Sequence, residues 1–72
     1  MVSATSRTAI RFGEEFRLIR LRTGVSQAAV ARAIGVDRGV ICRLEAGDTT
    51  VSDRIRAWAA GFVAAIAGGK RF

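Results

Sequence analysis

The chain has 72 residues, enough for one domain at most, and so short a chain buries too small a core to enclose a deep substrate cavity as well. It contains no His, no Tyr and one Cys, which excludes Cys/His metal sites and His-dependent catalysis within a single chain. A net charge of +6 indicates either a polyanionic partner or a generally basic surface. We expect no enzyme activity, no catalytic residue, no metal and no cofactor; a Ser–Lys or carboxylate site stays open, but no pattern marks one.

The ends of the chain show neither a signal peptide nor a membrane span. Residues 1–8 are polar and lack an apolar core segment. The longest apolar run, 57–69, is too short and too rich in Ala and Gly to cross a bilayer. A lone Cys fits a reducing compartment, so we expect a cytoplasmic protein without a membrane partner. We assign 1–7 as a flexible N-terminal arm, 8–67 as the domain and 68–72 as a short basic tail.

Apolar residues recur at helical spacing between short glycine-containing breaks, and Pro is absent, so we predict an all-α fold with short turns. The first helix is expected from about Thr8 to Arg22. Gly24 follows it, where the end of a helix favours a left-handed residue. Spacing of i, i+4 and i+7 defines the inner face of this helix. The residues on that face are Phe12, Phe16, Ile19 and Thr23.

The second and third helices are predicted on either side of a very short link. Ser26 is a suitable N-cap for a helix over 27–34, which Gly35 ends. Asp37 is a suitable N-cap for a third helix over 38–46. About three residues between two short helices force them to cross steeply, which is the helix-turn-helix unit, here at about 26–45. The inward residues of the two helices are Val30, Ala31, Ile34, Ile41 and Leu44.

A fourth helix is predicted after the polar turn 48–50, with Ser52 as its N-cap and the glycines 68–69 as its end. Capping residues, glycines and apolar spacing agree at each junction, and this agreement supports a small bundle of four helices. The inner face of the fourth helix carries Ile55, Trp58, Ala59, Phe62 and Ile66.

The segments at 24–27, 30–31, 34–36 and 41–47 read GVSQ, VA, IGV and ICRLEAG. In this order and spacing they resemble the Cro and phage-repressor (XRE) family. The resemblance implies a small four- to five-helix lambda-repressor-like bundle and a sequence-specific regulator of transcription that binds double-stranded DNA in a bacterial cell or phage-infected host. Flanking positions also fall in register with the family: Phe16, Ile19, Arg20, Ser52, Ile55, Trp58, Ala59 and Phe62.

Some positions depart from the family pattern. Val51 stands where the family usually has Pro, and Gly39 and Val40 replace small polar residues at the start of the third helix. These departures are compatible with the fold, but they leave open which bases the third helix contacts. The resemblance leaves the operator sequence and the choice between repressor and activator open.

In this family the third helix, here 38–46, lies in the DNA major groove. If Ile41 points to the core, a rotation of about 100° per residue directs Gly39 and Arg43 outward. A guanidinium can bind guanine O6 and N7 together, although either candidate arginine can instead contact only phosphate. The candidate base-reading residues are Arg38, Gly39, Val40 and Arg43.

Two candidates in this set have a second interpretation. Val40 can pack on a thymine methyl group or against the second helix. Gly39 can allow a close approach of the helix backbone to DNA, or its position can simply lack a constraint. Cys42, beside them, is interpreted as a small interface residue.

Contacts to the DNA backbone are expected from several positions. The resemblance implies that Ser26 and Gln27, at the start of the second helix, bind a phosphate, which the free amides and dipole of a helix N-terminus favour. The remaining arginines can equally form a solvated basic face. The further candidates are Arg11, Arg17, Arg22, Arg32, Thr49 and Thr50.

The resemblance also assigns a structural role and an assembly. Arg20 and Glu45 match family positions that form a partly buried ion pair between the first and third helices. Such proteins usually read two-fold symmetric sites as homodimers. The surplus apolar surface of the fourth helix is the candidate interface, with Trp58, Phe62, Val63 and Ile66. We expect no small-molecule effector. The alternative function is an antitoxin-like or other protein-interaction module on the same fold.

Overall fold

The computed structural model of the chain describes residues 7–70. This part of the chain contains four helices and no strand: α1 (Arg7–Thr23), α2 (Gln27–Ile34), α3 (Arg38–Glu45) and α4 (Asp53–Ala67). The predicted all-α fold is therefore confirmed. The predicted arm 1–7 lies outside the described residues except for Arg7, which is the first residue of α1 and not part of an arm. The last two residues of the predicted tail also lie outside.

The N-cap residues of α2, α3 and α4 differ in whether their side chains make a capping hydrogen bond. Ser26 has an extended backbone, and its Oγ accepts a hydrogen bond from the Ala29 amide at 3.0 Å, as an N-cap does. Asp37 and Ser52 have the same extended backbone, but neither side chain makes a capping bond. Their carbonyl oxygens accept hydrogen bonds from the amides of Val40 and Arg56, as the Ser26 carbonyl does from Val30. The expected side-chain caps at these two positions are therefore wrong, although the helices begin where they were predicted.

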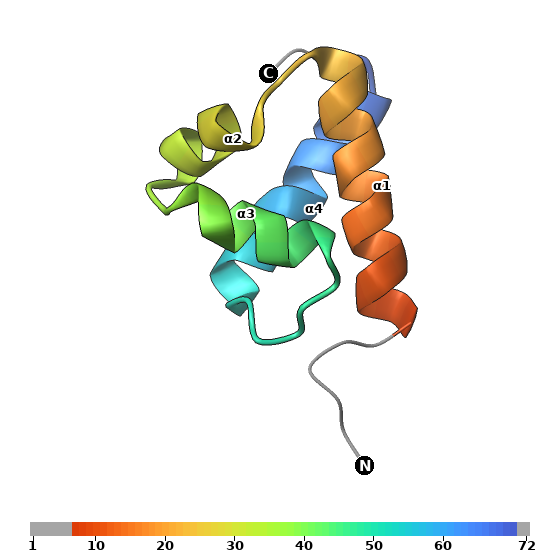
Figure 1. Cartoon of the computed structure of the whole chain (residues 1–72). Coiled ribbons are helices and arrows are strands. Elements are labelled where there is room, and N and C mark those ends of the chain that lie inside the picture. The colour runs from red at the N-terminus through yellow and green to blue at the C-terminus, as the bar shows by residue number, and fades with distance from the viewer. Residues whose placement is uncertain (1–6, 71–72) are drawn as a thin grey trace.

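The helices enclose one apolar core. Figure 1 shows α1 along one side of the molecule and α2 with α3 on the other. α3 packs against both α1 and α2, and α4 packs against α1. The Phe16 and Phe62 rings meet with centroids 5.4 Å apart, and they join α1 to α4. The buried apolar residues are Phe16, Val30, Ala31, Ile41, Leu44, Val51, Ile55, Ala59 and Phe62.

The inner face of α1 ends earlier than its spacing predicts. Thr23 was expected inside but is exposed, and its hydroxyl donates to the Arg20 carbonyl at 2.8 Å. Thr23 is the last residue of α1, and the chain turns at the left-handed Gly24 (φ +74) that follows it. The remaining predicted positions, Phe12, Phe16 and Ile19, are buried or half-buried in the core.

Two glycines allow the close contact between α1 and the end of α3. A Cβ at Gly13 would lie 2.6 Å from the carbonyl oxygens of both Leu44 and Glu45. A Cβ at Gly47, whose φ is +86, would lie 2.6 Å from Cγ1 of Ile10. The backbones meet here without side chains between them, which fixes how α3 is held. No helix within residues 7–70 is long and apolar enough to cross a membrane.

Candidate nucleic-acid interface

The turn between α2 and α3 sets the orientation of α3. Only residues 35–37 link the two helices. Gly35 is left-handed (φ +83), and the amides of Gly35 and Val36 both donate to the Ala31 carbonyl, at 2.8 and 2.9 Å. These bonds satisfy the end of α2 while the chain reverses into α3. The result is two short helices packed on each other across a tight turn, which is the helix-turn-helix geometry.

α3 has one buried and one exposed side. Ile41 and Leu44 are buried in the core, and Val40 is half-buried against it. The packing at Val40 matches one of its two interpretations and leaves part of the side chain exposed. Nothing lies within 4 Å of a Cβ built on Gly39, so packing in the protein does not require a glycine there. The exposed residues of α3 are Arg38, Gly39, Cys42 and Arg43.

A buried ion pair ties α3 to α1. Arg20 Nε donates to Glu45 Oε2 at 2.6 Å, and Arg20 Nη2 donates to Oε1 at 3.2 Å. The side chains of Arg20 and Glu45 are only 8% and 4% exposed. The third nitrogen of Arg20, Nη1, donates to the Val25 carbonyl at 2.9 Å. The charge pair therefore joins α1, α3 and the segment before α2, and its polar atoms are satisfied.

Gln27 extends this pair to the exposed side of α3. Its Nε2 donates to Glu45 Oε1 at 2.9 Å, and its Oε1 accepts a bond of 3.4 Å from Arg38 Nη1. One amide side chain thus connects the buried carboxylate to a candidate base reader. The sequence reasoning placed Gln27 at a phosphate and did not foresee either side-chain contact.

The exposed arginines of α1 do not share one face. Arg17 lies toward α3, since its Nε is 4.0 Å from Glu45 Oε1. At about 100° per residue, Arg11 and Arg22 lie on one side of α1, roughly 120–140° away from Arg17. Arg11 also lines a shallow groove together with Glu14 and Glu15. The structure therefore brings Arg17, but not Arg11 or Arg22, to the side of the recognition unit; Arg32 is exposed on α2.

The turn after α3 contains an acidic group that the sequence reasoning missed. Asp48 Oδ1 accepts the amide of Thr50 at 2.8 Å and its hydroxyl at 2.6 Å. Asp48 Oδ2 lies 3.7 Å from Nε of Arg43. The bonds from Thr50, helped by the charges of Arg43 and Arg56, lower the pKa of Asp48 below its usual value against a smaller effect of desolvation. An Asp two residues before a Thr in a polar turn is the signal that could have indicated this contact.

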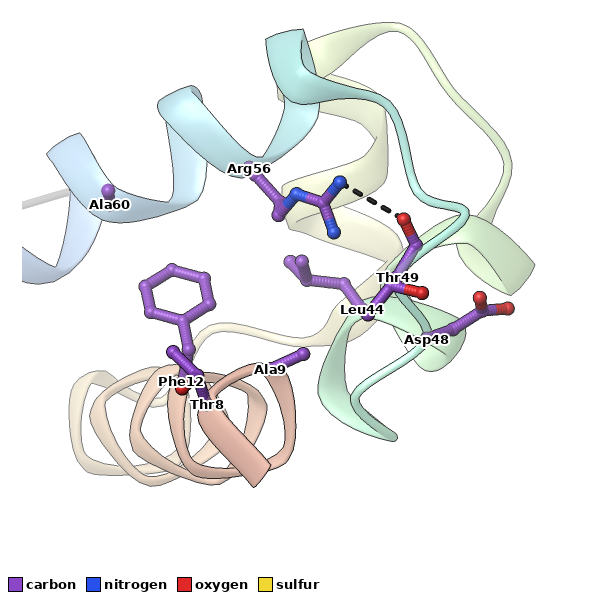
Figure 2. A pocket seen from close by; sticks show the side chains of 8 residues that line it. All are labelled: Thr8, Ala9, Phe12, Leu44, Asp48, Thr49, Arg56 and Ala60. Atoms are coloured by element: carbon purple, nitrogen blue, oxygen red, sulfur yellow. Dashed lines mark hydrogen bonds between the residues drawn. The ribbon is translucent and has the colours of Figure 1, made fainter. Parts of the chain in front are cut away.

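A surface cavity of about 470 Å³ lies behind this turn, between the start of α1, the end of α3 and α4. Figure 2 shows Phe12 and Ala60 on one side and Arg56, whose Nη2 donates to the Thr49 carbonyl at 3.0 Å, on the other. The bond holds the turn against α4. The expectation that no small-molecule effector binds stays a prediction. Within residues 7–70, no group of three or more His, Cys, Asp or Glu side chains gathers to hold a metal.

The candidate dimer residues divide into two kinds. Phe62 is 7% exposed and stacks on Trp58 with ring centroids 5.5 Å apart. The prediction that Phe62 lies on a dimer surface is wrong, because its ring is buried in the core of its own chain. Trp58, Val63 and Ile66 pack against the core but remain half-exposed.

A short bundle with α2 and α3 packed across a three-residue turn defines a helix-turn-helix protein. A family model described as a helix-turn-helix domain matches residues 11–67, so the chain belongs to this family, which includes XRE and Cro-like domains. Membership places the chain in a class of DNA-binding domains. No curated protein and no solved structure matches it.

Proposed function

We propose that the protein is a sequence-specific regulator of transcription of the Cro or repressor type, with α3 in the major groove of double-stranded DNA. The observation that carries this proposal is the division of α3 into two sides. Ile41, Leu44 and Glu45 anchor it, while Arg38 in its first turn and Arg43 in its last turn are exposed. A rigid helix with exposed guanidinium groups has the chemistry to read guanine edges.

Arg38 and Arg43 are the proposed base readers. Each can donate two bonds to guanine O6 and N7, with about 1–3 kcal/mol of discrimination for a good pair. Gln27 supports Arg38 through the bond to its Nη1. Val40 keeps enough exposure to contact a thymine methyl group, and Gly39 allows the helix backbone to approach the groove closely.

The proposed phosphate contacts come from residues around α3: the start of α2, the exposed side of α1 and the turn after α3. The amides at the start of α2, at Ser26 and Gln27, favour an anion because they have no partner within the helix. Arg17 lies on the same side as α3 and adds positive charge. Arg11, Arg22 and Arg32 do not lie beside α3. They would neutralise phosphates only where the DNA bends around the protein. Thr49 and Thr50 follow α3 and can approach the backbone, although the Thr50 hydroxyl already donates to Asp48.

The assembly is proposed to be a homodimer on a two-fold symmetric site. Val63 and Ile66 are three residues apart on α4 and keep surface beyond what the core covers. The two copies of α3 would lie about 34 Å apart to reach successive major grooves. Sedimentation of the parent and of a variant with Val63→Glu and Ile66→Glu tests this. A parent that stays monomeric at high concentration, both free and on DNA, contradicts it.

Selection of bound fragments from random duplex DNA tests the function itself. We expect an enriched site whose affinity exceeds that for random DNA by at least about a thousandfold. The binding constant should fall steeply with salt. A plot of log K against log[salt] should have a slope of about −0.9 for each phosphate neutralised. Absence of any enriched sequence would contradict the proposal.

A protein-interaction module of the antitoxin kind is the second candidate function. One observation favours it: Leu18 and Leu21 of α1 are 50% and 52% exposed. At about 100° per residue Leu18 is almost opposite Phe16 on the helix, so the core does not use it. Leu18→Gln with Leu21→Gln removes the apolar surface without adding charge beside Arg17, and it should leave DNA affinity unchanged under the first proposal. Loss of a protein partner and retention of DNA binding would show that both functions exist.

A further inference from the structure

An acidic side chain stands beside one of the two proposed base readers. Asp48 belongs to the turn after α3, and its Oδ2 lies 3.7 Å from Nε of Arg43. The Arg43 side chain is 56% exposed and that of Asp48 is 22% exposed, so both can be reached from solvent. A negative charge at this place is unfavourable for binding phosphates. Its position next to Arg43 therefore calls for another role.

The carboxylate of Asp48 is held in place by bonds that do not involve Arg43. Both the amide and the hydroxyl of Thr50 donate to Oδ1, which leaves Oδ2 directed at Arg43. Arg56 braces the turn from α4 through the Thr49 carbonyl. Figure 2 shows the Asp48 side chain pointing away from the cavity beside it. The carboxylate is thus held by its own turn, independently of Arg43.

The pairing also selects an edge of the guanidinium. Asp48 faces Nε, so the two terminal nitrogens of Arg43 remain available. These nitrogens form the edge that fits guanine O6 and N7 together. An arginine held by a neighbour loses less rotational freedom on binding than a free one. A carboxylate near the DNA also repels phosphates, which lowers affinity for random sequences.

From this geometry we infer that Asp48 is a positioning residue that sets the base preference of Arg43, a role that rests on the proposed function. Asp48 holds the side chain of Arg43 through Nε and orients its terminal nitrogens toward a guanine. Asp48 also weakens binding wherever no guanine is met. The G·C preference at one position of the site therefore depends on Asp48 through Arg43 and not on direct contact between Asp48 and a base.

Asp48→Asn tests the role, because the asparagine Oδ1 can still accept both bonds from Thr50 while the charge facing Arg43 is removed. Glu15→Gln is the matched control: it removes the same charge from an exposed acid on α1, away from the turn after α3. Affinities are measured for the selected duplex, for duplexes with each G·C pair replaced, and for random duplex DNA, in both the parent and the Arg43→Ala backgrounds.

We expect Asp48→Asn to raise affinity for random DNA and to reduce the preference for one G·C pair by about threefold or more. The preference should not change in Glu15→Gln, and Asp48→Asn should have no further effect on it in the Arg43→Ala background. Thr50→Val, which removes the hydroxyl bond to the carboxylate and keeps the amide bond, should reduce the same preference by a smaller factor. Thr50→Ser, which keeps the hydroxyl, should match the parent. Because Thr50→Val leaves Asp48 intact, it tests the role even if the Asn variant folds poorly.

Two results overturn the role and can be told apart. If Asp48→Asn strengthens binding to all duplexes equally while Arg43→Ala still relaxes one G·C pair, Asp48 is only a local charge and the proposed function stands. If the parent selects no sequence, or if Arg43→Ala weakens binding to all duplexes alike, base reading by Arg43 fails and the role of Asp48 fails with it.

Discussion

Two arginine–carboxylate pairs involve the last turn of α3, and they differ in almost every physical respect. The Arg20–Glu45 pair has a contact of 2.6 Å between side chains that are 8% and 4% exposed. The Arg43–Asp48 pair has a separation of 3.7 Å between side chains that are 56% and 22% exposed. The first pair joins two helices, whereas the second joins a helix to the turn that follows it.

The difference shows how one short helix serves both folding and recognition. Separating the buried pair would leave a charge away from water, so the pair restrains the angle between α1 and α3. Separating the exposed pair costs little, because water solvates both charges. Arg43 can therefore shift its terminal nitrogens toward a ligand at little cost, while Arg20 cannot leave Glu45. Gln27 lies between the two environments, with one bond to Glu45 and one to Arg38.

The largest effect should come from breaking the buried pair. Glu45→Ala removes the acceptor of Arg20 and of Gln27 at once, and we expect a loss of about 3–5 kcal/mol in the free energy of unfolding. Thermal or denaturant unfolding measures it. Glu15→Ala, an exposed acid on α1, is the matched control and should unfold like the parent. A double change of Arg20 and Glu45 to packed apolar residues should restore part of the loss.

One result would contradict the structural role of Glu45. If Glu45→Ala unfolds like the parent while DNA binding collapses, Glu45 belongs to the interface and not to the framework. The contrast between the two pairs would then be wrong, because both would act in recognition.

A second large effect should come from the glycine that brings α1 against α3. Gly13→Ala places a Cβ 2.6 Å from two backbone carbonyl oxygens, which cannot move aside as a side chain can. We expect a loss of about 1–3 kcal/mol in unfolding free energy, although Ala is the better helix former. Gly61→Ala in α4 meets nothing within 4 Å and should stabilise the protein by up to about 1 kcal/mol. Equal effects of the two changes would show that the close approach is not tight.

The exposed pair should affect binding and leave folding intact. Arg43→Ala is expected to weaken binding to the selected duplex by about 1–3 kcal/mol and to relax the preference at one G·C pair, as a bidentate contact requires. Its unfolding midpoint should stay close to that of the parent. Titrations against duplexes that differ at single base pairs measure both quantities. Equal weakening on every sequence would assign Arg43 to a phosphate.

Gln27 sharpens the comparison because it touches both regions. If its main ligand is a phosphate, Gln27→Ala lowers affinity for the selected duplex and for random DNA by the same factor. A loss confined to the selected duplex would mean that Gln27 acts by holding Arg38. Gln27→Glu is the informative partner variant: it keeps the length of the side chain but brings a negative charge next to Glu45.

The sequence predicts the elements well because local signals agree there. The glycines at 24 and 35 adopt the left-handed conformation expected at helix ends, and the residues predicted inward at Val30, Ile41 and Leu44 are buried. Periodicity fails at Thr23, since spacing along α1 carries no information about where its partner helices end. Gly13 has no signal of its own, because a mid-helix glycine is explained only by the backbone of another helix.

The candidate site is predicted less fully for a physical reason. Family resemblance identifies positions such as Arg20 and Glu45, but it says nothing about partners that come from other segments. The bonds of Gln27 to Glu45 and Arg38 need the orientation of α2 on α3. Phe62 was predicted both on the inner face of the fourth helix and in the dimer interface, and its stacking on Trp58 and contact with Phe16 use its surface within the chain.

The smallest expected effect concerns protonation of the exposed pair. Hydrogen bonds from the Thr50 hydroxyl and amide, with the charges of Arg43 and Arg56, lower the pKa of Asp48 below its ordinary 3.8. A carboxyl group with a lowered pKa in the folded state adds stability that is present above the unfolded value and is lost as the pH falls through the folded value. We therefore expect unfolding midpoints of the parent to fall slightly more steeply on acidification below about pH 4 than those of Asp48→Asn. Carboxyl ¹³C shifts followed by NMR should give Asp48 a midpoint below the ordinary 3.8, and Thr50→Val should raise that midpoint more than Thr50→Ser does. An Asp48 midpoint that Thr50→Val leaves unchanged would show that the Thr50 hydroxyl does not hold the carboxylate, and the exposed pair would then lack the fixed partner that distinguishes it from a loose surface contact.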